Sequence, residues 1–438
     1  MVESEKYKIK RGITMKKIKV ILIGAGSRGQ AYTDIMAELP GQFEVVGVAE
    51  PIEDRRDYIK NKHGIPDEKC FDTWEKILDI PKFADLAVIS TMDRMHKTPA
   101  IKATELGYDI LLEKPAAPSP EDCAEIKKAA NDNNVKVMVC HVLRYSPFYM
   151  SMKEIVDSGK LGRIMSVNHI ESVGNIHQSH SFVRGNWGNS EESSTMLLQK
   201  CCHDMDILQW ILGKECLKIQ SFGSLSHFTE ENAPEGAPER CVDGCPYADT
   251  CCYNAVKLYY DDKDNSWFRT TSTKKVNPTD EDVLKALKET QYGKCVYKCN
   301  NDVVDHQTVN MEFEDSITVT FSMNAFNEGG RQTRIMGTKG ELFADWNRAE
   351  LYTFVDKKRI PITLAPEKKG ESIVDGHGGG DGGIVLALYD YLTDKKDKTE
   401  VSEIDISFKN HLIVFAAEES RLTGKVIDMK EYKERIGI

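Results

Sequence analysis

Residues 18–35, IKVILIGAGSRGQAYTDI, decide the fold of the N-terminal part of the chain. An apolar run predicts a β-strand, three glycines follow in the spacing G-x-G-x-x-G, and the residues after them predict a helix. In such a unit the first glycine permits a tight turn, the second lets the backbone approach a pyrophosphate, and the third lets helix and strand pack closely. The stretch therefore predicts a dinucleotide-binding turn, and a glycine-rich turn without a ligand is the alternative. The predicted cofactor-binding residues of this turn are Gly24, Gly26, Ser27, Arg28 and Gly29.

An acidic residue at the end of the second predicted strand indicates which dinucleotide binds. Glu50 lies 21 residues after Gly29, where a carboxylate accepts hydrogen bonds from the ribose hydroxyls of the adenosine. This placement favours NAD. Arg55 and Arg56 follow closely and could hold a 2′-phosphate, so NADP stays open.

The first third of the chain alternates short apolar runs with amphipathic stretches from Ile18 to Leu112. Strands joined by helices at this spacing predict a parallel sheet. A further strand is predicted at 135–145, and Pro147 breaks the pattern. We therefore predict a tail over residues 1–16 and a Rossmann domain over residues 17–146.

Beyond Pro147 the predicted strands alternate apolar and polar residues with period two. Residues 308–326 and 334–347 each predict an antiparallel hairpin. The glycine-rich stretch 374–383 predicts a surface loop. Residues 147–438 are expected to form an α+β domain on a mainly antiparallel sheet, with a cysteine-rich insertion near 227–255.

Composition excludes several classes of protein. The 438 residues include 40% hydrophobic and 29% charged residues and carry a net charge of −11. This balance is typical of a soluble protein of at least two domains and disfavours nucleic acid or an anionic membrane as partner. The charged first residues lack the apolar segment of a secretory signal, so we expect a cytoplasmic protein.

Four motifs stand in order along the chain: GAGSRG (24–29), VAEP (48–51), ISTMDRMH (89–96) and LLEKP (111–115). Together they resemble the glucose–fructose oxidoreductase, inositol dehydrogenase and rhizopine catabolism (Gfo/Idh/MocA) family. The resemblance implies a Rossmann domain joined to an open-faced antiparallel sheet, and NAD(P)-dependent chemistry at a secondary hydroxyl of a sugar or cyclitol. It places Glu113 and Lys114 at the family's EKP carboxylate and active-site lysine. It places Thr91 and His96 in the loop that borders the nicotinamide and its ribose.

The resemblance also reaches a helix predicted from Thr195 to Leu212. His203 matches the histidine of the family's D-x-x-x-H motif, which is the general base in many members. The chain departs from that motif four residues earlier, where Gln199 replaces the aspartate and Lys200 follows. A neutral amide cannot accept a proton, so the usual carboxylate–histidine pair is in doubt.

Oxidation of a carbinol requires a group that removes the hydroxyl proton. A histidine with a pKa near 6.5, or a lysine whose pKa is lowered, meets that need. Lys114 and Lys200 in one cleft would lower each other's pKa. We predict that Lys114 and His203 carry the proton transfer and that Lys200 positions a substrate oxygen.

Substrate contacts are predicted in two further segments. One follows the last Rossmann strand, and the other is the polar loop 177–189, whose side chains can stack on a sugar ring and hydrogen-bond to it. A disordered loop, or a loop that contacts another subunit, is the alternative for 177–189. The predicted substrate-binding residues are Arg144, Tyr145, His180, Arg184, Trp187 and Gln199.

Four of the twelve cysteines lie close together, in the spacing C-x3-C-x5-C-C from Cys241 to Cys252. This spacing is compatible with a structural zinc site or an iron–sulfur cluster, and reduced cysteines without a metal are the alternative. Adjacent cysteines seldom both bind one ion. The predicted metal ligands are Cys241, Cys245 and Cys251, with His227, Cys295 or Cys299 as the fourth.

Three functions compete at this stage. The first is an NAD(P)-dependent sugar or cyclitol dehydrogenase, acting as a homo-oligomer, a dimer or a tetramer. The second is a redox-neutral glycosidase that oxidises the ring transiently, eliminates the glycosidic bond and adds water. The third is a non-catalytic regulator that binds a dinucleotide.

Overall fold

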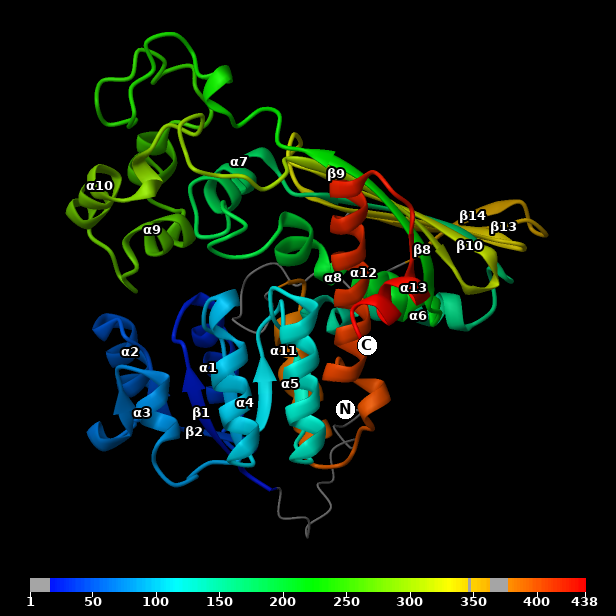
Figure 1. Cartoon of the computed structure of the whole chain (residues 1–438), viewed down its shortest axis with the longest axis horizontal. Coiled ribbons are helices and arrows are strands. Elements are labelled where there is room, and N and C mark those ends of the chain that lie inside the picture. The colour runs from blue at the N-terminus through cyan, green and yellow to red at the C-terminus, as the bar shows by residue number, and fades with distance from the viewer. Residues whose placement is uncertain (1–15, 346–347, 363–376) are drawn as a thin grey trace, which may run out of the picture.

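The computed structural model describes residues 16–345, 348–362 and 377–438. Two sheets dominate this part of the chain, a smaller one with helices on both faces and a larger one above it (Figure 1). All but the last residue of the predicted tail at 1–16 lies outside the described residues. None of the described helices has the length and apolar character that crossing a membrane requires.

The smaller sheet has six strands in the order β3-β2-β1-β4-β5-β6, all parallel, as the N-terminal pattern predicts. Its strands are β1 (Ile18–Ile23), β2 (Phe43–Ala49), β3 (Cys70–Phe71), β4 (Leu86–Ile89), β5 (Asp109–Leu112) and β6 (Val137–Val139). Its helices are α1 (Ser27–Ala37), α2 (Glu53–His63), α3 (Trp74–Leu78), α4 (Lys97–Glu105) and α5 (Pro120–Asp132). The strand order reverses between β1 and β4, so the loops at their carboxyl ends flank the position where this fold binds ligands.

The larger sheet has nine strands in the order β14-β13-β12-β11-β7-β10-β9-β8-β15. Only β7 and β10 pair in parallel among these described neighbours, so the predicted mainly antiparallel sheet is confirmed. Both predicted hairpins form, as β9–β10 and β11–β12. The strands are β7 (Ile164–Ser172), β8 (Cys216–Ser224), β9 (His306–Phe313), β10 (Ile317–Asn324), β11 (Gly330–Gly337), β12 (Gly340–Asp345), β13 (Arg348–Thr353), β14 (Lys358–Pro361) and β15 (Ile427–Asp428).

Helices fill the space between the two sheets. The helix predicted over 195–212 is α8 (Met196–Leu212), and α12 (Ile404–Thr423) ends as expected at Gly424, which adopts the left-handed conformation. Apolar side chains of α8, α12 and both sheets belong to one buried cluster. Figure 1 shows α12 running from the Rossmann domain to the underside of the nine-stranded sheet. Further helices are α6 (Pro147–Asp157), α7 (Asn175–His177) and α13 (Met429–Arg435).

The glycine-rich stretch 374–383 is not wholly the predicted loop. Residues 374–376 lie outside the described residues, but Gly380 begins α11 (Gly380–Leu392), which packs against the Rossmann domain in one cluster with Tyr32. A Cβ at Gly380 would lie 2.4 Å from the carbonyl oxygen of Val142. Gly380 therefore allows α11 to pack closely against Val142. A loop predicted from glycine content alone does not detect this packing.

The predicted strand at 135–145 is also too long. It ends at Val139, and a 3₁₀ helix follows over Val142–Tyr145. Apolar periodicity does not distinguish the strand from the 3₁₀ helix, because the residues of this short helix are buried like those of the strand.

An insertion of residues 225–305 separates β8 from β9 and lies at the upper left of Figure 1. It contains α9 (Ser266–Thr273) and α10 (Asp280–Glu289), which share an apolar cluster with Tyr259 and Tyr292. It also contacts the Rossmann domain, since the backbone N–H of Val276 donates to Asp54 at 2.7 Å.

The first prediction concerns the glycine turn. A Cβ at Gly29 would lie 2.2 Å from the carbonyl oxygen of Gly24, so Gly29→Ala should lower the free energy of unfolding by about 1–3 kcal/mol. Gly26→Ala is the matched control, because a Cβ there meets only Arg55 Nη1, at 3.9 Å, and φ is −68°. Thermal unfolding should show a lowered midpoint for the first variant alone. Equal midpoints would contradict this account of the turn.

Candidate active site

The glycine turn lies at the carboxyl end of β1, where Gly24 adopts a φ of +89°. Glu50 lies against it and is only 4% exposed. Its carboxylate accepts hydrogen bonds from the backbone N–H of Ala25, at 2.7 Å, and of Ile52, at 2.9 Å. The Arg55 guanidinium approaches the turn at Gly26, whereas Arg56 donates to the carbonyl oxygen of Glu50.

Two neighbouring loops are linked by His96. Its ring nitrogens lie 3.0 Å from the carbonyl oxygen of Thr91 and 2.8 Å from that of Pro115, which follows Lys114 through a cis peptide bond. The histidine is 1% exposed. It therefore holds the loop after β4 against the EKP turn after β5.

Arg28 forms several hydrogen bonds and ion pairs beside the glycine turn. From the first turn of α1 it donates to Glu113 at 2.9 Å and to both carboxylate oxygens of Asp381, at 2.7 and 3.1 Å. Tyr32 donates to Glu113 at 2.6 Å. Burial opposes the charge of Glu113, but Arg28 and Lys114 outweigh it and lower the pKa of that carboxyl. Glu113 and Arg28, both predicted cofactor contacts, are thus bound to each other and to the C-terminal helix α11.

Lys114 meets the second domain at α8. Its ammonium donates to the backbone carbonyl of Gln199 at 2.8 Å and lies 5.8 Å from the centre of the Trp187 ring. With its amide oxygen turned towards Lys114, the Gln199 side chain accepts from Lys114 Nζ and Trp187 Nε1, both at 3.2 Å. The residue that replaces the family's aspartate therefore positions the lysine.

His203 lies one turn further along α8 and is 6% exposed. Its Nδ1 has no hydrogen-bond partner among the described residues. Burial, then Lys114, then His141 lower the pKa of the His203 ring well below 6.5. The imidazole is consequently neutral at physiological pH, and one of its two ring nitrogens carries no proton.

Lys200 points to a separate ionic cluster. Its ammonium lies 3.4 Å from Glu171, which pairs with Arg331 at 2.8 Å. Arg331 also binds Asp204 at 2.7 Å. Burial lowers the pKa of Lys200, and the cation that adds to this effect is Arg331 rather than the predicted Lys114.

Four predicted substrate contacts are engaged elsewhere inside the protein. Arg144 is 3% exposed and forms an ion pair with Asp206, and Tyr145 hydrogen-bonds to Ser402. His180 stacks on Phe268 of the insertion, with ring centres 4.0 Å apart. Arg184 donates to carbonyl oxygens of the insertion. Of the six predicted residues, only Trp187 and Gln199 lie beside Lys114.

Sequence reasoning missed two histidines near His203. The His141 ring lies 5.9 Å from it between ring centres, and the His377 ring lies 6.3 Å from it. His377 Nδ1 is 3.0 Å from the Asp381 carboxylate. His141 follows a parallel strand at its carboxyl end, which is a usable signal. Nothing in the sequence pairs 377 with 203.

The predicted metal ligands lie in the insertion, away from Lys114 and His203. Cys241, Cys245 and Cys251 line one small cavity there, together with Cys295. As the side chains stand, the described residues contain no group of three or more histidine, cysteine, aspartate or glutamate residues arranged to hold a metal ion.

Comparison with known proteins matches two family models to the chain. Residues 18–141 match the oxidoreductase family with an NAD-binding Rossmann fold, and residues 153–359 match its C-terminal α/β domain. The chain belongs to the Gfo/Idh/MocA oxidoreductase family. The predicted resemblance is confirmed, and the N-terminal domain is an NAD-binding Rossmann domain.

Individual relatives are distant. YteT of Bacillus subtilis (strain 168), named as a candidate oxidoreductase, is 25% identical over 86% of this chain and 89% of its own. The 2,7-anhydro-N-acetylneuraminate hydratase of Mediterraneibacter gnavus is 26% identical over 45% of this chain and 50% of its own. A levoglucosan dehydrogenase solved with NADH and levoglucosan superposes with a TM-score of 0.68 at 17% identity, over 94% of this chain and all of that one.

The second prediction follows from the buried histidines. Burial lowers the pKa of His141 to about 3 and that of His411 to about 3. The unfolded chain takes up these protons near pH 6.5 and the folded chain does not, so the free energy of unfolding should fall as the pH drops from about 6.5 towards about 3. Unfolding midpoints measured across this range test the loss. His141→Gln should make it shallower, and an unchanged slope would show that His141 does not contribute.

Proposed function

We propose that the chain is an NAD-dependent dehydrogenase that oxidises a secondary hydroxyl of a sugar, a cyclitol or a related polyol. The observation that carries this proposal is the meeting of Lys114 and neutral His203 beside the end of β5, with the glycine turn at the end of β1, two strands away in the same sheet. A proton acceptor and a cation at that place are what carbinol oxidation needs.

The residues around the turn fit a dinucleotide. The space over Gly26 is open apart from Arg55, so a pyrophosphate can approach the start of α1, where Ser27 is exposed. Glu50 supports NAD over NADP, because its charge repels a 2′-phosphate. A dinucleotide held by its pyrophosphate at this turn would supply the hydride acceptor, so the proton is left to the protein.

The proton of the substrate hydroxyl passes to His203 in this proposal. A ring nitrogen of the neutral imidazole accepts it, and Lys114 donates a hydrogen bond to the oxygen as negative charge develops there. Gln199 holds the lysine in place without competing for the proton, because its amide is neutral. Lys200 stays the predicted second cation for another substrate oxygen, although in this structure its ammonium pairs with Glu171.

His377 supports a route from buried His203 to solvent. Its side chain is 42% exposed and is backed by the Asp381 carboxylate. The 6.3 Å between the ring centres of His203 and His377 suits a bridging water rather than a direct hydrogen bond. Asp381 would then stabilise the imidazolium of His377 while that ring holds the proton. The aspartate of the family motif cannot do this here, because Gln199 replaces it.

A redox-neutral reaction is the second candidate. It is favoured by one relative, the hydratase that acts on 2,7-anhydro-N-acetylneuraminate. On this route the same residues would assist a transient oxidation of the ring by NAD and the deprotonation of a neighbouring C–H. The leaving group would be eliminated, water would add, and the hydride would be returned to the ring. The regulator hypothesis is weaker, since it gives no use to Lys114 and His203.

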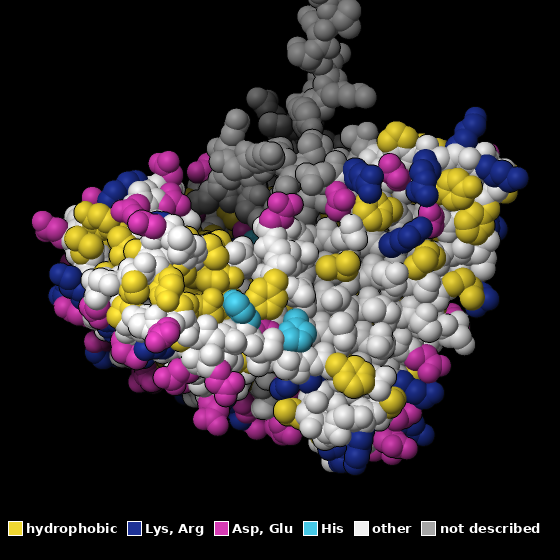
Figure 2. Space-filling view, turned by 90° about the horizontal axis from the view of Figure 1, so that it is seen from above, with side chains coloured by type: hydrophobic (Ala, Val, Ile, Leu, Met, Phe, Trp, Pro, Cys, Tyr) yellow, Lys and Arg dark blue, Asp and Glu magenta, His cyan; other side chains and the backbone are white. Residues whose placement is uncertain are grey.

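A homo-oligomer is part of the proposal. The outward face of the nine-stranded sheet exposes uncharged side chains, such as Thr308, Asn310, Thr318 and Thr320. Figure 2 shows that charged side chains gather mainly around the margins of the molecule seen from this side. Pairing of this face between copies would bury little charge.

The third prediction concerns the chemistry. Lys114→Ala and His203→Ala should each lower turnover about 10²–10⁴-fold with NAD affinity nearly unchanged, because positioned acids and bases contribute that much. Lys200→Ala should raise KM more than it lowers kcat, and Lys128→Ala, on the exposed surface, is the matched control. Single-turnover kinetics and NAD titration separate these effects.

The substrate is sought by incubating the protein and NAD with free sugars, cyclitols, anhydro-sugars and aryl glycosides. Absorbance of NADH reports a dehydrogenase, and a released aglycone or hydrated product without NADH reports the redox-neutral reaction. Near-normal hydride transfer by His203→Ala, with none by Lys200→Ala, would make Lys200 the base. Activity in neither assay across the panel would contradict both candidates.

A further inference from the structure

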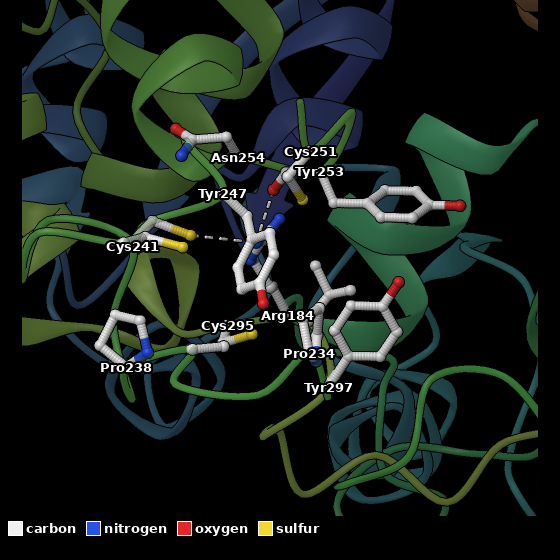
Figure 3. Close-up of a pocket in the computed structure, with 13 residues that line it drawn as sticks. Arg184, Pro234, Pro238, Cys241, Tyr247, Cys251, Tyr253, Asn254, Cys295 and Tyr297 are labelled. Atoms are coloured by element: carbon white, nitrogen blue, oxygen red, sulfur yellow. Dashed lines mark hydrogen bonds between the residues drawn. The ribbon is translucent and has the colours of Figure 1, made fainter. Parts of the chain in front are cut away.

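Four cysteines from two separate segments line a cavity of about 20 Å³ in the insertion. They are Cys241, Cys245 and Cys251 of the clustered segment and Cys295 beyond α10. Figure 3 shows Cys241, Cys251 and Cys295 arranged around this space. A cavity of this size has room for one water molecule or one ion.

Backbone hydrogen bonds hold the two segments together. The N–H of Cys241 donates to Gly293 at 2.9 Å, and the N–H of Cys295 donates to Glu239 at 2.8 Å. This antiparallel bridge keeps Cys241 and Cys295 on adjacent strands of chain. Gly244, at a φ of +79°, turns the chain before Cys245.

A turn brings in the remaining cysteine, because the N–H of Cys251 donates to the carbonyl oxygen of Tyr247 at 2.9 Å. The neighbouring Cys252 is exposed and does not line the cavity. The fold thus selects one of two adjacent cysteines.

Arg184 gives an independent observation that favours a negatively charged group at this place. It is 1% exposed and donates to the carbonyl oxygens of Lys294 and Tyr253, each at 2.7 Å. Its Nη2 also lies 3.7 Å from Cys241 Sγ, and its Nη1 has no hydrogen-bond partner among the described residues. No carboxylate in the described part of the chain forms an ion pair with it.

A buried guanidinium without a counter-charge is costly. Four thiolates around one divalent metal carry a net negative charge, which would compensate that cost. Binding would release the thiol protons to solvent and draw the sulfur atoms inwards, since they are not yet arranged around one point.

We propose that Cys241, Cys245, Cys251 and Cys295 bind one structural zinc ion, with Arg184 as its buried counter-charge. Four cysteines are a common ligand set for zinc, which needs no open coordination position in a structural site. The ion would close residues 252–294 into a loop. That loop carries α9, α10 and the contact of Val276 with Asp54, so zinc would fix the insertion against the Rossmann domain.

The fourth prediction is that purified full-length protein contains about one zinc per chain by elemental analysis. Cys251→Ser and Cys295→Ser should each lose most of that zinc, because three thiolates remain. Cys252→Ser and Cys299→Ser are the matched controls and should keep it. NAD titration of every variant shows whether the Rossmann domain is intact.

A second measurement does not depend on variants. Protein stripped by a chelator should unfold at a lower temperature and recover on addition of zinc, and cobalt should give the intense sulfur-to-metal absorption of a tetrathiolate site. Iron with acid-labile sulfide, zinc retained by Cys251→Ser, or metal-free protein with an unchanged unfolding temperature would each overturn the proposal.

Discussion

The guanidinium of Arg28 holds together parts of the chain that lie far apart in sequence. It donates to Glu113 at the end of β5 and to Asp381 at the start of α11, while its own helix begins at the glycine turn. One partly buried cation therefore fixes the cofactor turn, the EKP loop and the C-terminal segment relative to one another. Lys114 follows Glu113 directly and His377 contacts Asp381, so both chemical groups depend on the same contacts.

The charges around α8 bear on the proposed role of the buried His203 as a base. Lys114 and Arg331 both favour the neutral form of the buried His203 ring. Arg331 is itself paired with Asp204 and Glu171, and these two carboxylates stabilise its positive charge. A carboxylate at position 199 would oppose this effect, whereas the amide of Gln199 does not.

Much of the fold was predictable, because it follows from local patterns. The glycine turn and the alternating apolar runs predict the parallel sheet, and period-two alternation predicts the hairpins of the second sheet. Position along a helix predicts that Gln199 and His203 share one side of α8. The cysteine spacing indicates a common site, although the fourth cysteine of the cavity lies beyond two helices and only the structure selects it.

The errors arise where contacts between distant residues override local pattern. Glycines before α11 resemble a loop in the sequence but permit close packing on Val142. Arg144, His180 and Arg184 have side chains suited to a sugar and are buried by tertiary contacts, so their role as substrate contacts stays a prediction. His377 was missed because its neighbour His203 lies in a different part of the sequence.

The central claim is that Arg28 acts on the cofactor site through its network with Asp381. A double-mutant cycle on NAD affinity, measured by calorimetric titration for Arg28→Met, Asp381→Asn and the combined variant, tests it most directly. The account predicts that each single substitution weakens binding and that the combined variant is little worse than either, with a coupling energy of about 0.5–3 kcal/mol. Losses that simply add, or an Asp381→Asn variant that binds NAD normally, would contradict it.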